Sequence, residues 1–143
     1  MKIVINAQYG GFGLSKLAIE EYLKLKGKKS YFYSTECDGK KIYYKKIDSL
    51  FKEDIFTLCF TKDLGEIING EEISEYIWEK HCFSAKKVKR TDEDLIKVVG
   101  KLKEKANTIC SKLKVIEIPD DVDYEIEEYD GNEWISEKHR TWA

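Results

Sequence analysis

KIVINAQYGGFGLS, residues 2–15, is the part of the sequence that most strongly indicates the fold class. The β-branched run Ile3-Val4-Ile5 favours a short buried strand, and the glycines after it indicate a loop. Ser15 is a good N-cap for a helix whose apolar positions recur at helical spacing as far as Lys26, and Gly27 is suited to end that helix. The order of strand, glycine loop and helix therefore predicts an α/β protein.

Further strands are predicted downstream of this first helix. Aromatic and β-branched residues on both sides of Asp38-Gly39 predict a β-hairpin over residues 31–44. The nearly continuous apolar run at residues 55–60 is typical of a central strand buried on both faces. Asn69-Gly70 indicates a turn, after which a short helix is expected over residues 71–79.

The second half of the chain predicts a long helix followed by strands. Thr91 offers an N-cap, and the acids after it suit the positive end of a helix that contains Gly100. Residues 113–118 predict another buried strand. Residues 122–129 and 133–139 flank Asp130-Gly131 and predict an antiparallel hairpin.

Length and composition fit one soluble domain. The 143 residues are 42% hydrophobic and 36% charged, proportions that differ from those of disordered and membrane-spanning chains. We therefore expect residues 1–143 to form a single α/β domain, with a mixed α+β arrangement as the alternative. It would hold a central mixed sheet, two main helices and a C-terminal β-hairpin.

Charge and cysteine spacing exclude several classes of function. The 27 acids and 25 bases leave a net charge of -2, so we expect no nucleic-acid partner. The apolar opening is much shorter than a membrane helix, so we expect no membrane partner. Cysteines 37, 59, 82 and 110 form no CxxC pair, and no secretory leader precedes them. We expect reduced thiols, a cytoplasmic location, and neither a metal nor a cofactor.

Two features point to an anionic ligand. The glycine loop at residues 10–13 is similar to anion-binding first turns, although its spacing fits neither a dinucleotide fingerprint nor a Walker loop. Arg90 and Arg140 are the only arginines among the 25 basic residues, which suggests a need for a planar fork on phosphate or carboxylate. The alternatives are a tight structural turn for the loop and a surface charge or ion pair for the arginines.

The last ten residues before Ala143 concentrate aromatic and charged side chains. In a strand, alternation would place Trp134, Ser136, Lys138 and Arg140 on one face and Glu133, Ile135, Glu137 and His139 on the other. The first face would offer an aromatic platform beside a cation, suited to stacking a base and holding a phosphate. Alternatively, Trp134 and Trp142 simply cap the core.

Catalysis has a weaker basis in the sequence. Glu133 or Glu137, near His139, would supply the positioned carboxylate that cleavage of a nucleotide N-glycosidic bond needs. Acids occupy 27 positions, however, so such proximity is expected by chance. Cysteine–histidine catalysis is less favoured still, because the cysteines lie among apolar neighbours.

Three blocks of sequence carry a resemblance to a known family. They are residues 2–15, Arg90-Thr91-Asp92 with the helix after it, and residues 118–142, which run from IPDDV through IEEYDG and EWI to HRTW. Together they cover roughly half of the chain and resemble a family of small phage and prophage proteins. That family commonly has a proline after Arg-Thr-Asp where this chain has Glu93, so the entry into the helix is expected to differ.

The resemblance implies a genomic setting more than a reaction. Small phage proteins include sponges that sequester nucleotide-derived immune signals, often as symmetric oligomers. By analogy of setting we expect a binding protein, not an enzyme, that captures such a signal in the host cytoplasm and counters defence, with a homo-oligomer as an option. The alternatives are an enzyme acting at a nucleotide N-glycosidic bond and a protein-binding inhibitor anchored by tryptophans.

The expected ligand-binding residues come from all three blocks. They are Asn6, Tyr9, Gly10, Gly11, Phe12, Ser15, Arg90, Asp92, Trp134, Arg140 and Trp142.

Overall fold

The computed structural model describes residues 1–47 and 56–138. The chain divides into two compact units. Unit 1 comprises residues 1–22 and 85–143, and unit 2 comprises residues 23–84. The described helices and strands confirm a mixed α+β class with a C-terminal β-hairpin.

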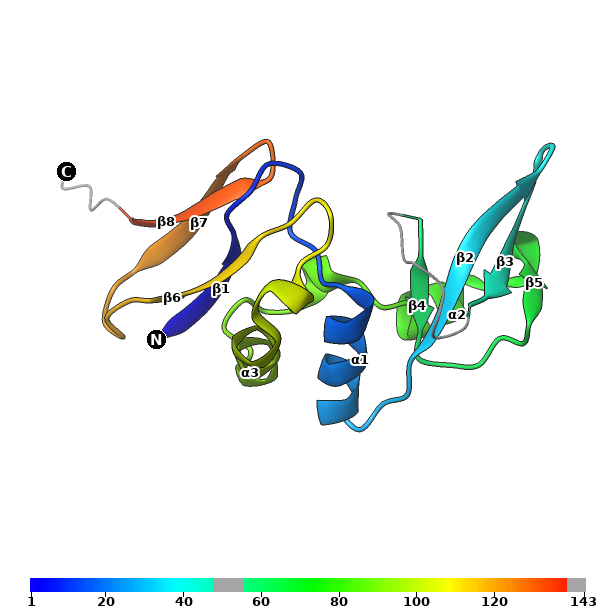
Figure 1. Ribbon diagram of the computed structural model, residues 1–143, viewed down its shortest axis with the longest axis horizontal. Coiled ribbons are helices and arrows are strands. Elements are labelled where there is room, and N and C mark those ends of the chain that lie inside the picture. The colour runs from blue at the N-terminus through cyan, green and yellow to red at the C-terminus, as the bar shows by residue number, and fades with distance from the viewer. Residues whose placement is uncertain (48–55, 139–143) are drawn as a thin grey trace. The chain divides into compact units, whose positions relative to one another are not determined.

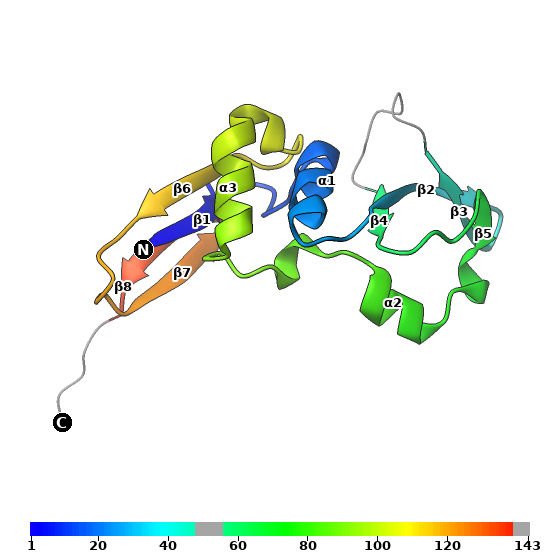
Figure 2. The ribbon, with the colours of Figure 1, turned by 90° about the horizontal axis from the view of Figure 1, so that it is seen from below.

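Unit 1 is built in layers around its first strand. Strand β1 (Lys2–Asn6) pairs antiparallel with β6 (Leu113–Glu117), with Val4 opposite Val115. Helix α3 (Glu93–Leu102) covers one side of this pair, and the hairpin of β7 (Tyr124–Tyr129) and β8 (Asn132–Glu137) lies on the other (Figures 1 and 2). The layers enclose a core of Ile3, Val4, Ile5, Leu95, Val98 and Val99.

The two short 3-10 helices of unit 1 connect these layers. Helix η2 (Ala85–Lys87) precedes α3, and η3 (Lys103–Ala106) follows it. The acids predicted to favour the start of α3 lie in its first turn, but the N-cap is Asp92, not Thr91. The Asp92 carboxylate accepts hydrogen bonds from the main-chain N–H groups of Asp94 and Leu95, which a threonine hydroxyl one residue earlier does not reach.

Helix α1 (Lys16–Leu25) confirms the first predicted helix. The hydroxyl of Ser15 accepts a hydrogen bond from the N–H of Ala18 at 3.1 Å, so Ser15 is the N-cap. Gly27, at a φ of 73°, ends the helix, and the N–H of Lys28 returns to the carbonyl of Leu23. The division between the two units falls within this helix.

Unit 2 holds a four-stranded antiparallel sheet. Its strands are β2 (Tyr31–Asp38), β3 (Lys41–Lys46), β4 (Leu58–Phe60) and β5 (Ile67–Asn69), in the order β4-β2-β3-β5. Helix η1 (Gly70–Glu72) and helix α2 (Glu75–His81) follow β5. Its buried core is Tyr33, Phe60 and Ile73, and the half-buried Trp78 packs against it. The ring centroids of Tyr33 and Phe60 are 5.7 Å apart, and those of Phe60 and Trp78 are 5.3 Å apart.

The structure differs from the sequence-based expectations in three places. The predicted central strand at 55–60 is wrong in position, because β4 lies at the edge of its sheet; residue 55 lies outside the described residues. The helix expected over 71–79 is divided, because the side chain of Ser74 caps α2 through the N–H of Ile77. The strands occupy three antiparallel sheets, where one central mixed sheet was expected.

Two further findings bear on the expected location. Within residues 1–47 and 56–138, no helix has the length and apolar character needed to cross a membrane. All four cysteines are free: Cys37 is exposed, Cys59 is buried, and Cys82 and Cys110 are half-buried.

Close approach of two turns explains the glycine loop. The hairpin turn has Asp130 at a φ of 49° and Gly131 at 85°, which is the two-residue turn that Asp-Gly predicts. A Cβ at Gly131 would overlap the main chain of Gly10 and Gly11, and a Cβ at Gly10 would lie 2.6 Å from the carbonyl oxygen of Cys110. The loop is therefore packed against main-chain atoms on two sides.

We predict that Gly131→Ala lowers the free energy of unfolding by about 3 kcal/mol, because left-handed strain of about 1–2 kcal/mol adds to a steric overlap of similar size. The control is Gly39→Ala, since Gly39 has a φ of 62° but open space around its Cβ position. In the control, the free energy of unfolding should fall only by the cost of this backbone strain, about 1–2 kcal/mol. Urea denaturation followed by circular dichroism measures both, and equal losses would contradict the close approach.

Candidate functional site

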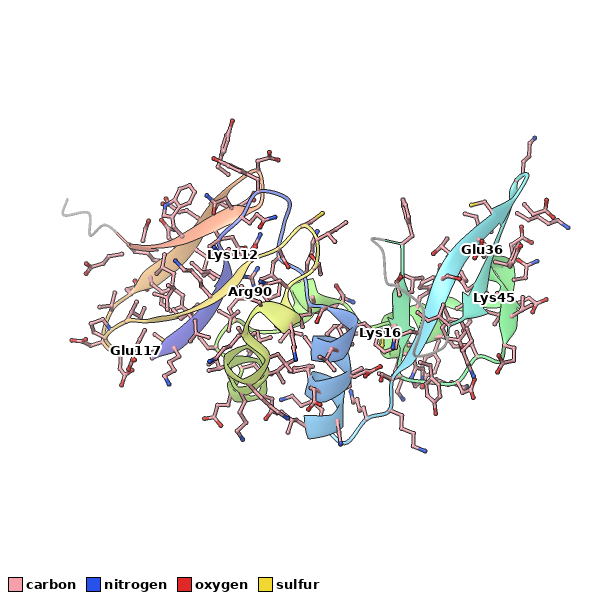
Figure 3. All side chains as sticks on the ribbon, in the orientation of Figure 1. Lys16, Glu36, Lys45, Arg90, Lys112 and Glu117 are labelled. Carbon is pink, nitrogen blue, oxygen red and sulfur yellow. The ribbon has the colours of Figure 1, made fainter. Side chains whose placement is uncertain are left out.

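A paired arginine lies at the centre of unit 1. Arg90, labelled in Figure 3, precedes α3 and reaches across to the hairpin strand β8. Its Nη1 donates to Oε1 of Glu133 at 2.6 Å, and its Nη2 donates to Oε2 at 2.9 Å. The side chains of Arg90 and Glu133 are 19% and 10% exposed, so this bidentate pair is largely removed from water.

Two other contacts fix the plane of the guanidinium. Its central carbon lies 3.6 Å from the centroid of the Phe12 ring, which is a close cation–π stack. Nη1 also contacts the carbonyl oxygen of Val4 at 3.3 Å, while the N–H of Val4 donates to the carbonyl of Arg90 at 2.9 Å. The arginine thus links the glycine loop, β1, β8 and the start of α3.

Asn6 extends this network at the end of β1. It is fully buried, and its main-chain N–H donates to Oε1 of Glu133 at 2.8 Å. Its Nδ2 donates to the carbonyls of Gln8 and Gly131 at 2.9 and 2.7 Å, and its Oδ1 accepts from the N–H of Lys112 at 2.8 Å. One asparagine side chain therefore joins the segment before the glycine loop, the residue before β6 and the hairpin turn.

The chemistry of this cluster is that of a satisfied structural network. Glu133 accepts three hydrogen bonds, two from Arg90 and one from Asn6. Within the described residues, no buried side-chain polar atom lacks a partner. A carboxylate held in this way is oriented toward the protein interior and is poorly placed to act on a bound substrate.

The other residues predicted near the loop are also used internally. Tyr9 packs edge-on against Tyr129, with centroids 6.5 Å apart, and the N–H of Gly10 donates to the carbonyl of Asp130. The hydroxyl of Ser15 donates to the carbonyl of Lys105 at 2.6 Å. The Cβ position of Gly11 meets no neighbouring atom.

Asp92 and the described C-terminal candidates make contacts of their own. Asp92 caps α3 and accepts a hydrogen bond from the hydroxyl of Tyr22 at 2.9 Å. Trp134 is 43% exposed, and its register opposite Glu127 places it on the hairpin face that Glu133 does not share. Glu137 ends β8. The predictions for His139, Arg140 and Trp142 lie outside the described residues.

A groove runs along the exposed side of α3. Its volume is about 690 Å³, and Met1, Lys2 and Val115 of β6 line it together with residues of α3. Ile96, Val115 and Met1 give it apolar surface. The polar lining residues are Lys2, Thr91, Glu93 and Lys97.

The side chains that line the groove carry a net positive charge, and the space beside Gly100 is open. Lys2 and Lys97 are exposed, and neither pairs with a carboxylate in the described part of the chain. Glu93 is the one carboxylate among the described lining residues. Gly100 also lines the groove, and a Cβ there would meet nothing within 4 Å. An anion with an apolar body fits this lining.

Sequence reasoning did not select the groove residues. Lys97 is one of many lysines, and Lys2 precedes a strand whose buried face drew attention first. The usable signal was the helical spacing of Glu93, Lys97 and Gly100, which puts a glycine beside a charged pair on one face of the predicted helix. For metals, residues 1–47 and 56–138 contain no cluster of three histidine, cysteine or carboxylate ligands.

We predict that Arg90→Lys destabilises the protein by about 2 kcal/mol although it keeps the charge. A lysine ammonium lacks the fork that holds both oxygens of Glu133 and the flat surface that stacks on Phe12. Lys138→Gln is the control, because Lys138 pairs with Asp123 at 3.7 Å on the exposed surface and should change stability by less than about 0.5 kcal/mol. Chemical denaturation provides the measurement.

A coupled measurement separates a structural arginine from a ligand-binding one. Arg90→Lys combined with Glu133→Gln should be far less destabilising than the sum of the single changes, because both act on one pair. Additive losses would show that the pair makes no such contribution in solution.

Comparison with family models, curated proteins and solved structures found no match to this chain. The resemblance to small phage and prophage proteins therefore stays a prediction.

Proposed function

We propose that this protein is a small-molecule binding protein that captures a nucleotide-derived anion in the groove between α3, β1 and β6. The main support for this proposal is the groove, which combines apolar surface with two lysines that lack carboxylate partners in the described chain. Ligand pockets of this kind have volumes of roughly 300–1,000 Å³, and about 690 Å³ falls inside that range.

The ligand class follows from the lining. Lys2 and Lys97 supply ammonium groups for phosphate oxygens, and the hydroxyl of Thr91 supplies a further hydrogen bond. Ile96 and Val115 offer a surface for the flat face of a base or for a sugar. No aromatic residue is among the described lining residues, so base recognition here rests on apolar contact instead of the aromatic stacking first expected.

The biological setting in this proposal comes from the sequence resemblance. A phage protein that holds a nucleotide signal without converting it lowers the free signal in the host cytoplasm and blunts the defence that depends on it. Capture needs affinity and abundance but no general acid or base. This role agrees with a groove that displays lysines and a threonine for contact with phosphate oxygens.

The enzymatic alternative has less support. It requires Glu133 or Glu137 as a carboxylate poised at a substrate, and Glu133 is held by Arg90 and Asn6. The proposal and this alternative differ in what happens to the ligand. Purified protein is incubated with nucleoside phosphates, cyclic nucleotides and cyclic dinucleotides, and then separated from free ligand and denatured by heat. Intact ligand released in stoichiometric amount supports capture, whereas a converted ligand supports catalysis.

Charge removal in the groove provides the first prediction for binding. Lys97→Gln should weaken the ligand identified in that screen by roughly tenfold or more, because one charge-assisted hydrogen bond contributes about 1.5–3 kcal/mol. Lys101→Gln is the matched control, since Lys101 lies on the same helix and pairs with Glu21 at 3.5 Å. Calorimetric titration measures both. Equal affinity for Lys97→Gln and wild type would remove the groove from the site.

The second prediction concerns Gly100, where a small side chain should stabilise the helix and a large side chain should block the ligand. Gly100→Ala should raise the free energy of unfolding by about 0.5–1 kcal/mol, because a helix interior favours alanine and the Cβ has open space. Gly100→Leu should fill the groove and reduce binding at least tenfold with the fold retained. Full affinity in a folded Gly100→Leu variant would contradict a ligand in this groove.

A further inference from the structure

The outer face of the β7–β8 hairpin carries exposed aromatic side chains. Strand register pairs Glu127 with Trp134 and Tyr129 with Asn132 on this face, whereas Glu133 points inward to Arg90. Tyr129 is 71% exposed and Trp134 is 43% exposed. Large aromatic residues gathered on an exposed strand face are typical of interaction surfaces.

A third ring extends the surface beyond the hairpin. Tyr9, which directly precedes the glycine loop, is 60% exposed and packs edge-on against Tyr129. Trp134 is held in place because its Nε1 donates to Oε2 of Glu127 at 2.8 Å, and the hydroxyl of Ser136 donates to the same oxygen at 2.6 Å. The rings are thus positioned before a partner binds, which reduces the entropy lost on binding.

The hairpin that carries these rings is predominantly acidic, and the lysine that directly follows it, Lys138, pairs with Asp123 at 3.7 Å. Residues 120–137 contain no lysine or arginine, and their acids are Asp120, Asp121, Asp123, Glu125, Glu127, Glu128, Asp130, Glu133 and Glu137. Glu125 and Glu127 lie on the same hairpin face as Trp134. Aromatic rings beside carboxylates attract a cation through the ring face and through Coulomb attraction together.

We propose that this aromatic and acidic face, formed by Tyr9, Glu125, Glu127, Tyr129 and Trp134, binds an arginine-rich segment of a partner protein. The chain already contains the same chemistry on its inner side, where Arg90 lies between the Phe12 ring and the Glu133 carboxylate. Arginine fits better than lysine because its planar group stacks on a ring while its edge pairs with a carboxylate. The negative potential disfavours nucleic acid at this face.

This surface is independent of the groove. The groove residues belong to α3, β1, β6 and the N-terminus, whereas the face belongs to the hairpin and the glycine loop, on the other side of β1 and β6 in Figure 1. Loss of one binding activity should therefore leave the other unchanged. Lys97→Gln and Gly100→Leu, which change the groove, test whether the two binding activities are independent.

The test uses the full chain labelled with ¹⁵N and a synthetic nine-residue peptide of alternating arginine and glycine. The Trp134 indole signal is assigned by its loss in Trp134→Phe. Titration with the arginine peptide should shift the indole signal of Trp134 and the amide signals of Glu125 and Tyr129. The same peptide with citrulline in place of arginine should shift none of them, because citrulline lacks the charge.

Variants decide whether the rings and the carboxylates act together. Tyr129→Ala and Glu125→Gln should each weaken the arginine peptide by roughly threefold to tenfold. Tyr76→Ala should leave the affinity unchanged, because Tyr76 is similarly exposed at 61% but lies in unit 2. Retention of the Arg90 and Asn6 amide signals confirms that each variant is folded.

Three results would overturn the proposal. One is equal affinity for wild type and both folded variants. Another is a set of peptide-induced shifts confined to residues outside the hairpin and the glycine loop. The last is a concentration-dependent dimer, detected by sedimentation without peptide and abolished by Tyr129→Ala, which would make a second copy of this chain the occupant of the face.

Discussion

The arrangement of unit 1 depends on Arg90, because this residue contacts segments that lie far apart in the sequence. Its fork holds Glu133 of the last strand, its face lies on Phe12 of the glycine loop, and its main chain pairs with Val4 of the first strand. Removing two charges from water costs free energy, and a bidentate pair with a stacked ring offsets that cost only in one geometry. The pair therefore specifies how β1, the loop and the hairpin meet.

This constraint also determines which faces of unit 1 stay open to solvent. Because the inner face of the hairpin is occupied by the Arg90 network, the face that stays open to solvent is the outer one, which carries Trp134 and Tyr129. The opposite side of β1 and β6 belongs to α3, and the groove lies along that helix. In unit 1, the β1–β6 pair and the core around it thus lie between the lysine-bearing groove and the acidic and aromatic surface.

Local features of the fold could be predicted from the sequence, and long-range ones could not. The Ser15 cap, the Gly27 terminus and the Asp130-Gly131 turn each depend on residues within one turn of chain, so their signals are visible in sequence. The Arg90–Glu133 pair joins residues 43 positions apart, and no local pattern assigns one carboxylate among 27 to that arginine. The prediction of a central strand at residues 55–60 was wrong for a related reason, because apolar character indicates burial but does not show which strands lie on either side.

The pairing of β1 with β6 has a consequence for the order in which the protein is made. Lys2 lies opposite Glu117, so the first strand has no partner until more than a hundred further residues have been synthesised. Unit 2 is continuous in sequence, from residue 23 to residue 84, and its sheet can assemble as soon as that segment leaves the ribosome. The first strand and the glycine loop must wait, with Ile3, Val4 and Ile5 in contact with water, for the arrival of the segment that will cover them. Until the second half of unit 1 has been synthesised, this first strand is therefore exposed to chaperones, proteases and aggregation.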